Sequence, residues 1–172
     1  MGFVNSVKTC FGKYVDFSGR ANRPEYWWFF LFAMVVAALL AVLDRVIFGF
    51  DAETGQAPRI LRGLFQLAIL LPLLAVAWRR MHDSGRPGWY VLLPMLISFA
   101  FLVATLAGVV TFAAVETRLD DPRVLIAPAA WLGGFGVAFV AAVQLALAIL
   151  MLWWLTRPSQ AGPNQYGPAP DS

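Results

Sequence analysis

The chain is divided near its middle by a short charged segment, Trp78-Arg79-Arg80-Met81-His82-Asp83-Ser84-Gly85-Arg86-Pro87-Gly88-Trp89-Tyr90. This segment contains three arginines, the single histidine of the chain, an aspartate, two glycines and a proline. Long apolar runs without charged residues lie on both sides of it. Because about 20 consecutive apolar residues are enough for a helix to cross a membrane, the pattern predicts a small protein that spans the membrane several times.

The composition of the chain agrees with this prediction. Of the 172 residues, 60% are hydrophobic and only 13% are charged, whereas a soluble domain carries about 25% charged residues. Lysine and arginine lie almost wholly between the apolar runs, so we expect lipid headgroups as their partners before nucleic acid. The only cysteine, Cys10, excludes an intrachain disulfide and a cysteine-based metal site.

The predicted fold is all-α: a polytopic four-transmembrane-helix bundle with an N-terminal amphipathic interfacial helix. The spans are expected at about residues 26–43, 60–78, 89–115 and 128–155. The first run is too long for the apolar region of a cleaved signal peptide, so we interpret it as an uncleaved first span. The domain division is a cytoplasmic amphipathic helix and turn at 1–25, a transmembrane domain at 26–157 and a cytoplasmic tail at 158–172.

The N-terminal helix is predicted from helical periodicity. One arc of the wheel carries Phe3, Val4, Val7, Cys10, Phe11 and Tyr14, and lysines lie opposite. Such a helix can lie in the headgroup plane, and the alternative is a terminus packed on its neighbours. The first span should open at Pro24, with Asn22 or Arg23 before it and Glu25 favourable to the helix dipole.

Lysine and arginine are more numerous on the side that holds both termini and the central loop. The positive-inside rule therefore predicts that both termini and the central loop are cytoplasmic. The apolar runs contain no ionisable residue apart from Arg62 near one end, which disfavours an ion-coupled transporter. The polar residues within them are expected to bond to their own helix or a neighbour; they are Gln66, Ser98, Thr105, Thr111 and Gln144.

Small residues recur every fourth position in the fourth span. They are Ala130, Gly134, Ala138, Ala142 and Ala146. Since small residues let helices approach closely in lipid, this helix is expected either at the centre of the bundle or at a homo-oligomer interface through Gly134, Ala138 and Ala142. The sequence leaves these two alternatives open.

Two basic motifs, at residues 19–25 and 79–86, are expected to meet on the cytoplasmic rim. The first interpretation is an anion or lipid-headgroup site, because arginine binds phosphate bidentately; its residues are Arg20, Arg23, Arg79, Arg80, His82 and Arg86. The second is a structural rim clamp, in which Glu25 and Asp83 pair with these arginines. Both interpretations are compatible with the charges.

No catalytic residue, metal site or cofactor is predicted, and the chain is not expected to be an enzyme. His82 and Asp83 are adjacent, so on a helix they do not face each other and make a poor chelating pair. Asp83 is instead expected to turn the loop by bonding to backbone amides near Gly85.

These motifs carry a family resemblance. Three segments resemble the bacterial inner-membrane family called domain of unknown function 805. They are Phe17-Ser18-Gly19-Arg20-Ala21-Asn22-Arg23-Pro24-Glu25-Tyr26-Trp27-Trp28-Phe29, Arg79-Arg80-Met81-His82-Asp83-Ser84-Gly85-Arg86-Pro87-Gly88-Trp89, and the tail Gly162-Pro163-Asn164-Gln165-Tyr166-Gly167-Pro168. Members more often have Leu at 81, Thr at 84, and Arg or Lys at 165. The stretch from about Ala104 to Ala130 is longer than in compact members.

The resemblance implies a small polytopic protein of the bacterial inner membrane and carries over no activity. Composition alone predicts a mobile tail, whereas the resemblance implies that Asn164 and Tyr166 dock on the rim. Our leading hypothesis is a non-enzymatic membrane protein whose rim binds anionic lipid or a protein partner, with envelope maintenance as its setting. The alternatives are a small oligomeric channel or transporter, and a membrane enzyme acting on lipid headgroups through His82 and Asp83.

Overall fold

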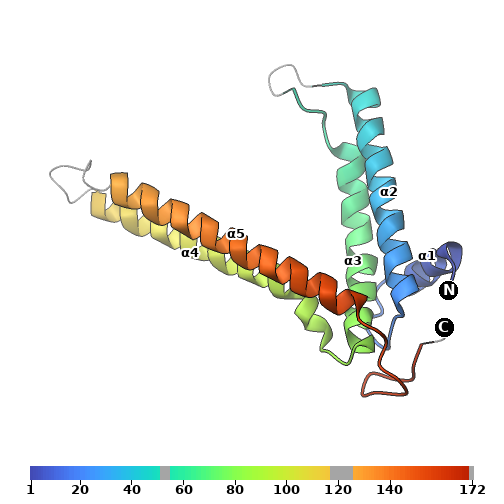
Figure 1. Cartoon of the computed structure of the whole chain (residues 1–172). Coiled ribbons are helices and arrows are strands. Elements are labelled where there is room, and N and C mark those ends of the chain that lie inside the picture. The colour runs from blue at the N-terminus through green and yellow to red at the C-terminus, as the bar shows by residue number, and fades with distance from the viewer. Residues whose placement is uncertain (51–54, 117–125, 171–172) are drawn as a thin grey trace. The chain divides into compact units, whose positions relative to one another are not determined.

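The computed structural model describes residues 1–50, 55–116 and 126–170 (Figure 1). In this part of the chain the secondary structure is helical and no strand is formed. The elements are α1 (Phe3–Gly12), α2 (Arg23–Phe48), α3 (Ile60–Asp83), the 3₁₀ helix η1 (Gly88–Leu92), α4 (Leu93–Glu116) and α5 (Ile126–Thr156). Four stretches are long and apolar enough to cross a membrane: Arg23–Phe48, Ile60–Asp83, Gly88–Phe112 and Gly133–Thr156. The all-α prediction with four candidate spans is confirmed.

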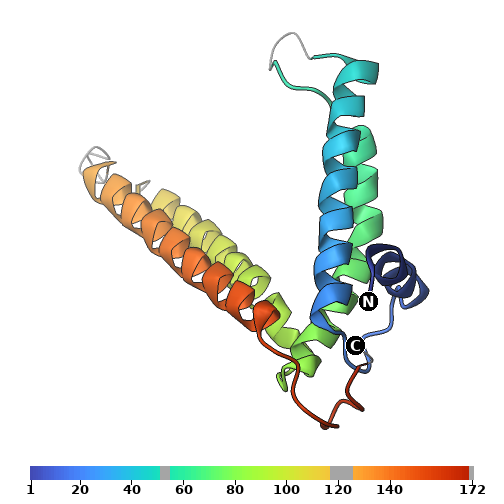
Figure 2. The ribbon, with the colours of Figure 1, turned by 45° about the vertical axis from the view of Figure 1, so that its right-hand side comes forward.

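The chain forms two compact units. One unit contains Met1–Val91 and Trp154–Ser172, and the other contains Leu92–Trp153. In the first unit α2 and α3 lie side by side in both views, and α1 packs on them (Figures 1 and 2). In the second, α4 and α5 run side by side (Figure 2). The association of all four spans into one bundle stays a prediction.

The start of α2 is capped by Asn22, one of the two residues expected before the helix. Its side-chain oxygen accepts a hydrogen bond from the amide of Glu25 at 2.9 Å, which satisfies one of the amides that a helix start leaves without a partner. The helix begins at Arg23, one residue before the expected Pro24.

The other end of α2 continues past residue 43, where the first span was expected to end. The helix includes Asp44 and Arg45 and ends at Phe48. The carboxylate of Asp44 is buried and accepts the amides of Leu61 (2.8 Å) and Arg62 (3.1 Å). Asp44 therefore caps the start of α3 from the neighbouring helix, and this use of its charge is compatible with a helical backbone.

The central loop is shorter than predicted. We expected it to start at Arg79, but α3 continues as a helix to Asp83 because its last charged residues are paired, as described below. The helix stops before Gly85, whose φ of 75° lies in the left-handed region that glycine adopts at little cost. The amide of Gly85 donates to the carbonyl oxygen of His82 at 3.0 Å.

The helix α1 is held on α2 by its buried face, on which Ser6 and Cys10 lie one turn apart. Phe3 meets Trp28 edge-on with the ring centroids 5.8 Å apart, and Phe11 meets Phe29 in the same way at 5.5 Å. A helix is thus present where the sequence predicts one, and its packing agrees with the alternative of a terminus seated on its neighbours.

In the second unit, Ser98, Thr111 and Gln144 bond within their own helix or to the neighbouring one, as predicted. The amide of Gln144 donates to the carbonyl of Pro94 at 3.1 Å and to the hydroxyl of Ser98. Thr111 donates to the carbonyl of Ala107 one turn before it at 3.0 Å. The proposed interface residues on α5 are exposed in this unit; they are Gly134, Ala138 and Ala142.

Candidate functional site

The ends of α2 and α3 bring together five charged side chains that are at most 5% exposed. Glu25 comes from the first turn of α2, and Arg20 comes from the segment before that helix. The remaining three come from the last turns of α3. Burial of charges is costly unless they are paired, so the partners of each group determine what this cluster can do. We call it the arginine–carboxylate cluster: Arg20, Glu25, Arg79, Arg80 and Asp83.

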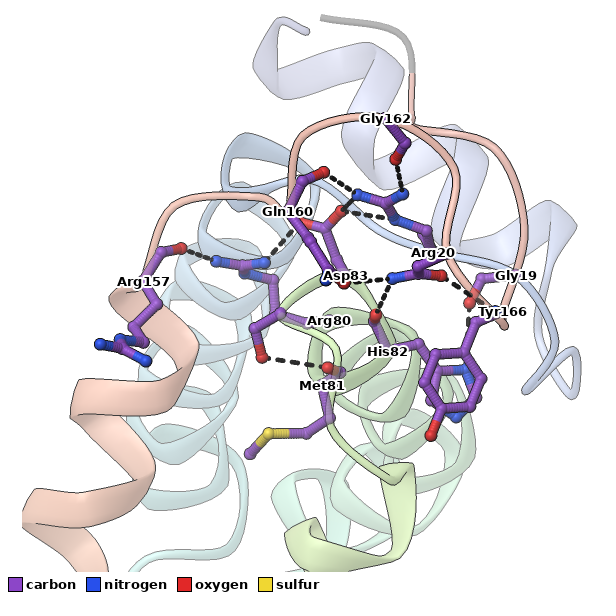
Figure 3. Close-up of polar contacts among 12 residues, drawn as sticks. Gly19, Arg20, Arg80, Met81, His82, Asp83, Arg157, Gln160, Gly162 and Tyr166 are labelled. Carbon is purple, nitrogen blue, oxygen red and sulfur yellow. Dashed lines mark hydrogen bonds and ion pairs between the residues drawn. The ribbon is translucent and has the colours of Figure 1, made fainter.

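Asp83 is shared by two arginines (Figure 3). Its Oδ1 accepts from Nε of Arg20 at 3.0 Å, and its Oδ2 accepts from Nη1 of Arg80 at 2.6 Å. The expectation that Asp83 would bond to backbone amides near Gly85 was wrong. Two buried guanidinium groups attract the carboxylate more strongly than neutral amides do, and the Gly85 amide bonds to His82 instead.

Backbone carbonyls of the C-terminal segment complete the coordination of these arginines. Arg20 donates to the carbonyl oxygens of Gln160 and Gly162, each at 2.6 Å. Arg80 donates to the carbonyl of Leu155 at 3.1 Å and to that of Arg157. One carboxylate cannot neutralise two guanidinium groups, so these carbonyl dipoles supply the remaining stabilisation. The expectation of a mobile tail was therefore wrong for this segment.

His82 anchors the rest of the tail. Its ring stacks on that of Tyr166 with the centroids 3.8 Å apart and the planes parallel (Figure 3). Its Nδ1 lies 3.1 Å from the carbonyl oxygen of Gly19, and its own carbonyl accepts from the side-chain amide of Asn164 at 3.0 Å. The docking of Asn164 and Tyr166 that the resemblance implies is confirmed.

Arg79 forms a second, separate ion pair. Its Nη1 donates to Oε1 of Glu25 at 2.8 Å. The thiol of Cys10 lies 3.9 Å from the same oxygen. Burial, together with the charge of Glu25, raises the pKa of Cys10 to about 12. We had assigned Cys10 to the apolar face of α1, and only its spacing of four from Ser6 hinted at a buried polar seam.

The two remaining arginines of the predicted headgroup site lie at the surface. Arg23 is exposed at the start of α2. Arg86 is half-buried, with its guanidinium 5.2 Å from the ring centroid of Trp154, and it donates to the carbonyl of Ser84 at 3.3 Å. The predicted site is therefore divided into a surface part and a buried part whose charges are paired internally, with Nε and Nη2 of Arg79 the buried donors that lack a hydrogen-bond partner among the described residues.

The charged groups of the cluster are bonded to one another and to backbone carbonyls. His82 and Asp83 bond to different partners and do not act on a common atom. Within the described ranges, no three metal-ligating side chains of His, Cys, Asp or Glu lie close enough to hold an ion. The hydrogen bonds of the cluster and of His82 hold α2, α3, the end of α5 and the tail together at one place.

The chain matches one family model and several known relatives, two of which are described here. Residues 14–168 match the family model described as "Protein of unknown function (DUF805)". The inner membrane protein YhaI of Escherichia coli K12 is 41% identical over 90 residues, which are 52% of this chain and 70% of that protein. The inner membrane protein YhaH of the same strain is 36% identical over 90 residues, which are 52% of this chain and 72% of that protein. No solved structure matches. The family match includes the cluster and the docked tail but begins after α1.

Proposed function

The chain belongs to the DUF805 family of inner-membrane proteins of unknown function, and from that premise we propose that it is a non-enzymatic protein that binds anionic lipid on the cytoplasmic side. In this proposal the arginine–carboxylate cluster is the support, and the surface of α1 beside the start of α2 is the binding face. Both termini lie in the cytoplasm, as the distribution of lysine and arginine favours.

The internal bonding of the cluster supports the first half of the proposal. Arg79 and Arg80 have no exposed surface, and each already donates to a carboxylate. A lipid phosphate that displaced Glu25 or Asp83 would leave a buried carboxylate without its partner, which is strongly unfavourable. These arginines therefore fix the helix ends, and other cations must meet the lipid.

One observation carries the second half: α1 presents cationic and apolar side chains together at the surface. Lys8 and Lys13 are exposed, as are the apolar residues Phe3, Val4 and Phe11. A helix of this kind binds a membrane surface by inserting apolar side chains at the acyl boundary while its lysines meet anionic headgroups.

The face continues onto α2. Arg23 is exposed in its first turn, and Trp28 is 40% exposed one turn further on. Tryptophan prefers the depth at which headgroups meet acyl chains. We therefore define the lipid-binding face by Lys8, Lys13, Arg23 and Trp28.

The test is hydrogen exchange on the protein in nanodiscs of phosphatidylethanolamine, with or without phosphatidylglycerol. In the wild type, anionic lipid should slow the exchange of α1 amides. The variant Lys8→Gln/Lys13→Gln/Arg23→Gln should lose this dependence, because all three substitutions are at exposed positions that the fold does not need. The matched control is Arg45→Gln/Arg59→Gln, exposed arginines at the other end of the helix pair, which should behave like the wild type. Equal exchange with both lipid compositions would contradict the proposal and favour a protein partner at this face.

A further inference from the structure

A polar hollow lies at the end of the α2–α3 pair that is remote from the arginine–carboxylate cluster. Its volume is about 210 Å³. Its charged lining consists of one acid, Asp44, and three arginines. Asp44 is already engaged, since its two oxygens accept the amides of Leu61 and Arg62. The hollow therefore has an excess of positive charge that its own acid does not offset. The three arginines are Arg45, Arg59 and Arg62.

An apolar groove adjoins this hollow. It lies between α2 and α3, has a volume of about 460 Å³, and is lined mainly by Phe30, Ala33, Ala37, Phe65, Ile69 and Leu73. Ala41 and Arg62 line both the hollow and the groove. The two are therefore continuous, and together they form a surface with a cationic head and an apolar extension.

The groove has the depth of one leaflet. Its lining follows α2 from Ala41 to Phe30, which is about 16 Å at 1.5 Å per residue. Half of a hydrocarbon core of ~30 Å is about the same length. A chain that starts at the polar hollow and lies in this groove would reach the middle of the membrane.

Arg62, at the junction, has an unsatisfied donor. Its Nε is buried and has no hydrogen-bond partner in the described part of the chain. A buried donor without a partner costs free energy, and an acceptor oxygen at the junction would remove that cost. The groove side chains do not supply one in the structure: the lining is apolar apart from Arg62 and Gln66, and neither the amide of Gln66 nor another described group bonds to this Nε.

We propose that this surface binds one anionic phospholipid, with its phosphodiester at Arg45, Arg59 and Arg62 and one acyl chain in the groove. The phosphate oxygens supply the acceptor that Nε of Arg62 lacks, and the excess positive charge selects an anionic over a zwitterionic headgroup. The small side chains of Ala33, Ala37 and Ala41 leave room for the chain on the face of α2. This site is separate from the α1 face and lies at the opposite end of α2.

The first test is native mass spectrometry of the full chain, purified with equal amounts of phosphatidylglycerol and phosphatidylethanolamine that have identical acyl chains. The wild type should retain one phosphatidylglycerol. The variant Arg45→Gln/Arg59→Gln/Arg62→Gln should retain at least tenfold less, and Arg45→Gln/Arg59→Gln, at exposed positions, should retain less even if the triple variant fails to fold. The control Lys8→Gln/Lys13→Gln/Arg23→Gln should keep this lipid, which separates the present site from the α1 face.

The second test fills the groove and leaves the arginines in place. Ala37→Leu/Ala38→Leu should reduce the retained lipid by a similar factor, because the acyl chain loses its space. Unchanged retention in the arginine and groove variants, or equal retention of the two lipids, would overturn the proposal. So would a lipid-free dimer, which would assign the groove to a second copy, or displacement of the lipid by glycerol phosphate, which would assign the hollow to a soluble anion.

Discussion

The hydroxyl group of Tyr14 donates a hydrogen bond to the backbone carbonyl of Ala68 in α3. Ala68 lies four residues before Pro72, which is inside the same helix. Because proline has no N–H, the carbonyl of Ala68 lacks its usual helical donor. A side chain that follows α1 thus compensates for a proline in the second span, and it ties the N-terminal helix to the transmembrane pair.

Substitution Tyr14→Phe should lower the free energy of unfolding by about 1 kcal/mol, the usual contribution of one hydrogen bond. In a Pro72→Ala background the same substitution should have a smaller effect, because the amide at position 72 then serves the Ala68 carbonyl. Denaturant unfolding of the four proteins in detergent measures this coupling. Equal effects in both backgrounds would show that the hydroxyl stabilises the fold by another contact.

Substitution Asp83→Asn should be severe. It leaves the guanidinium groups of Arg20 and Arg80 buried without a counter-charge, and loss of one partner of a buried pair costs about 3–5 kcal/mol. Arg23→Gln is the control, since Arg23 is exposed and surface substitutions usually change stability by less than ~0.5 kcal/mol. Thermal unfolding measures both. Comparable melting temperatures of the two variants would show that the cluster contributes little to stability.

The thiol of Cys10 should resist maleimide in the folded protein at pH 8 and react fully in a denaturing detergent. Burial blocks access, and the raised pKa, about 12 against an ordinary 9.0, keeps the thiol protonated. The thiol ionises at a lower pH in the unfolded chain than in the folded protein, so the contribution of the protonated thiol to folding stability is complete below pH 9 and is lost as the pH rises towards 12. A cysteine at exposed position 159, made as Ser159→Cys in a Cys10→Ser chain, should react quickly. Rapid labelling of native Cys10 would be inconsistent with its packing under α2.

Substitution Gly88→Ala should destabilise the turn after α3. A Cβ atom there would lie 2.0 Å from the indole ring of Trp78, which is itself held edge-on against Phe17. Overpacking of this kind costs about 1–3 kcal/mol. The double variant Trp78→Leu/Gly88→Ala should be less destabilised than the sum of its single substitutions, and thermal unfolding of the four proteins tests this. Strict additivity would mean that the indole moves aside without cost.

Substitution Tyr166→Ala should release the tail without unfolding the helices. It removes the ring that stacks on His82, so proteinase K, which has broad specificity, should cleave within the tail after Pro158 several times faster than in the wild type. Gln165→Ala, at an exposed neighbouring position, is the control. Mass spectrometry of the digest reports the site. Equal cleavage of the wild type and both variants would mean that the tail is held by its backbone contacts alone.

Hydropathy and local signals predicted what depends on nearby residues. The all-α class, the four candidate spans and the start of α2 near Asn22 and Arg23 follow from periodicity and side-chain chemistry within a few positions. The sequence also named the charged residues that meet at the rim, because they interrupt the apolar runs. It misplaced the helix ends at Asp44 and Arg79, since a charge marks the end of a span only if it has no partner nearby.

What could not be predicted depends on contacts between distant positions. Asp44 caps a helix that starts 16 residues later, and the carbonyls that bind Arg20 are about 140 residues away. Carbonyls are present at every position, so no residue pattern marks the ones that will be used. Pro72 shows in the sequence that the carbonyl of Ala68 will lack its helical donor. The sequence does not show that the hydroxyl of Tyr14 will reach this carbonyl.

The carbonyls of the tail also impose an order on the folding of the protein during its synthesis. The ribosome delivers Arg20, Arg80 and Asp83 long before Leu155 to Gly162, which supply the last acceptors of the cluster. Before these carbonyls are made, the guanidinium groups of Arg20 and Arg80 have only part of their hydrogen bonds. The folding of α2 and α3 is therefore completed only when the full-length chain has been translated. A product truncated before Leu155 would lack these acceptors and would leave the guanidinium groups of Arg20 and Arg80 partly unsatisfied.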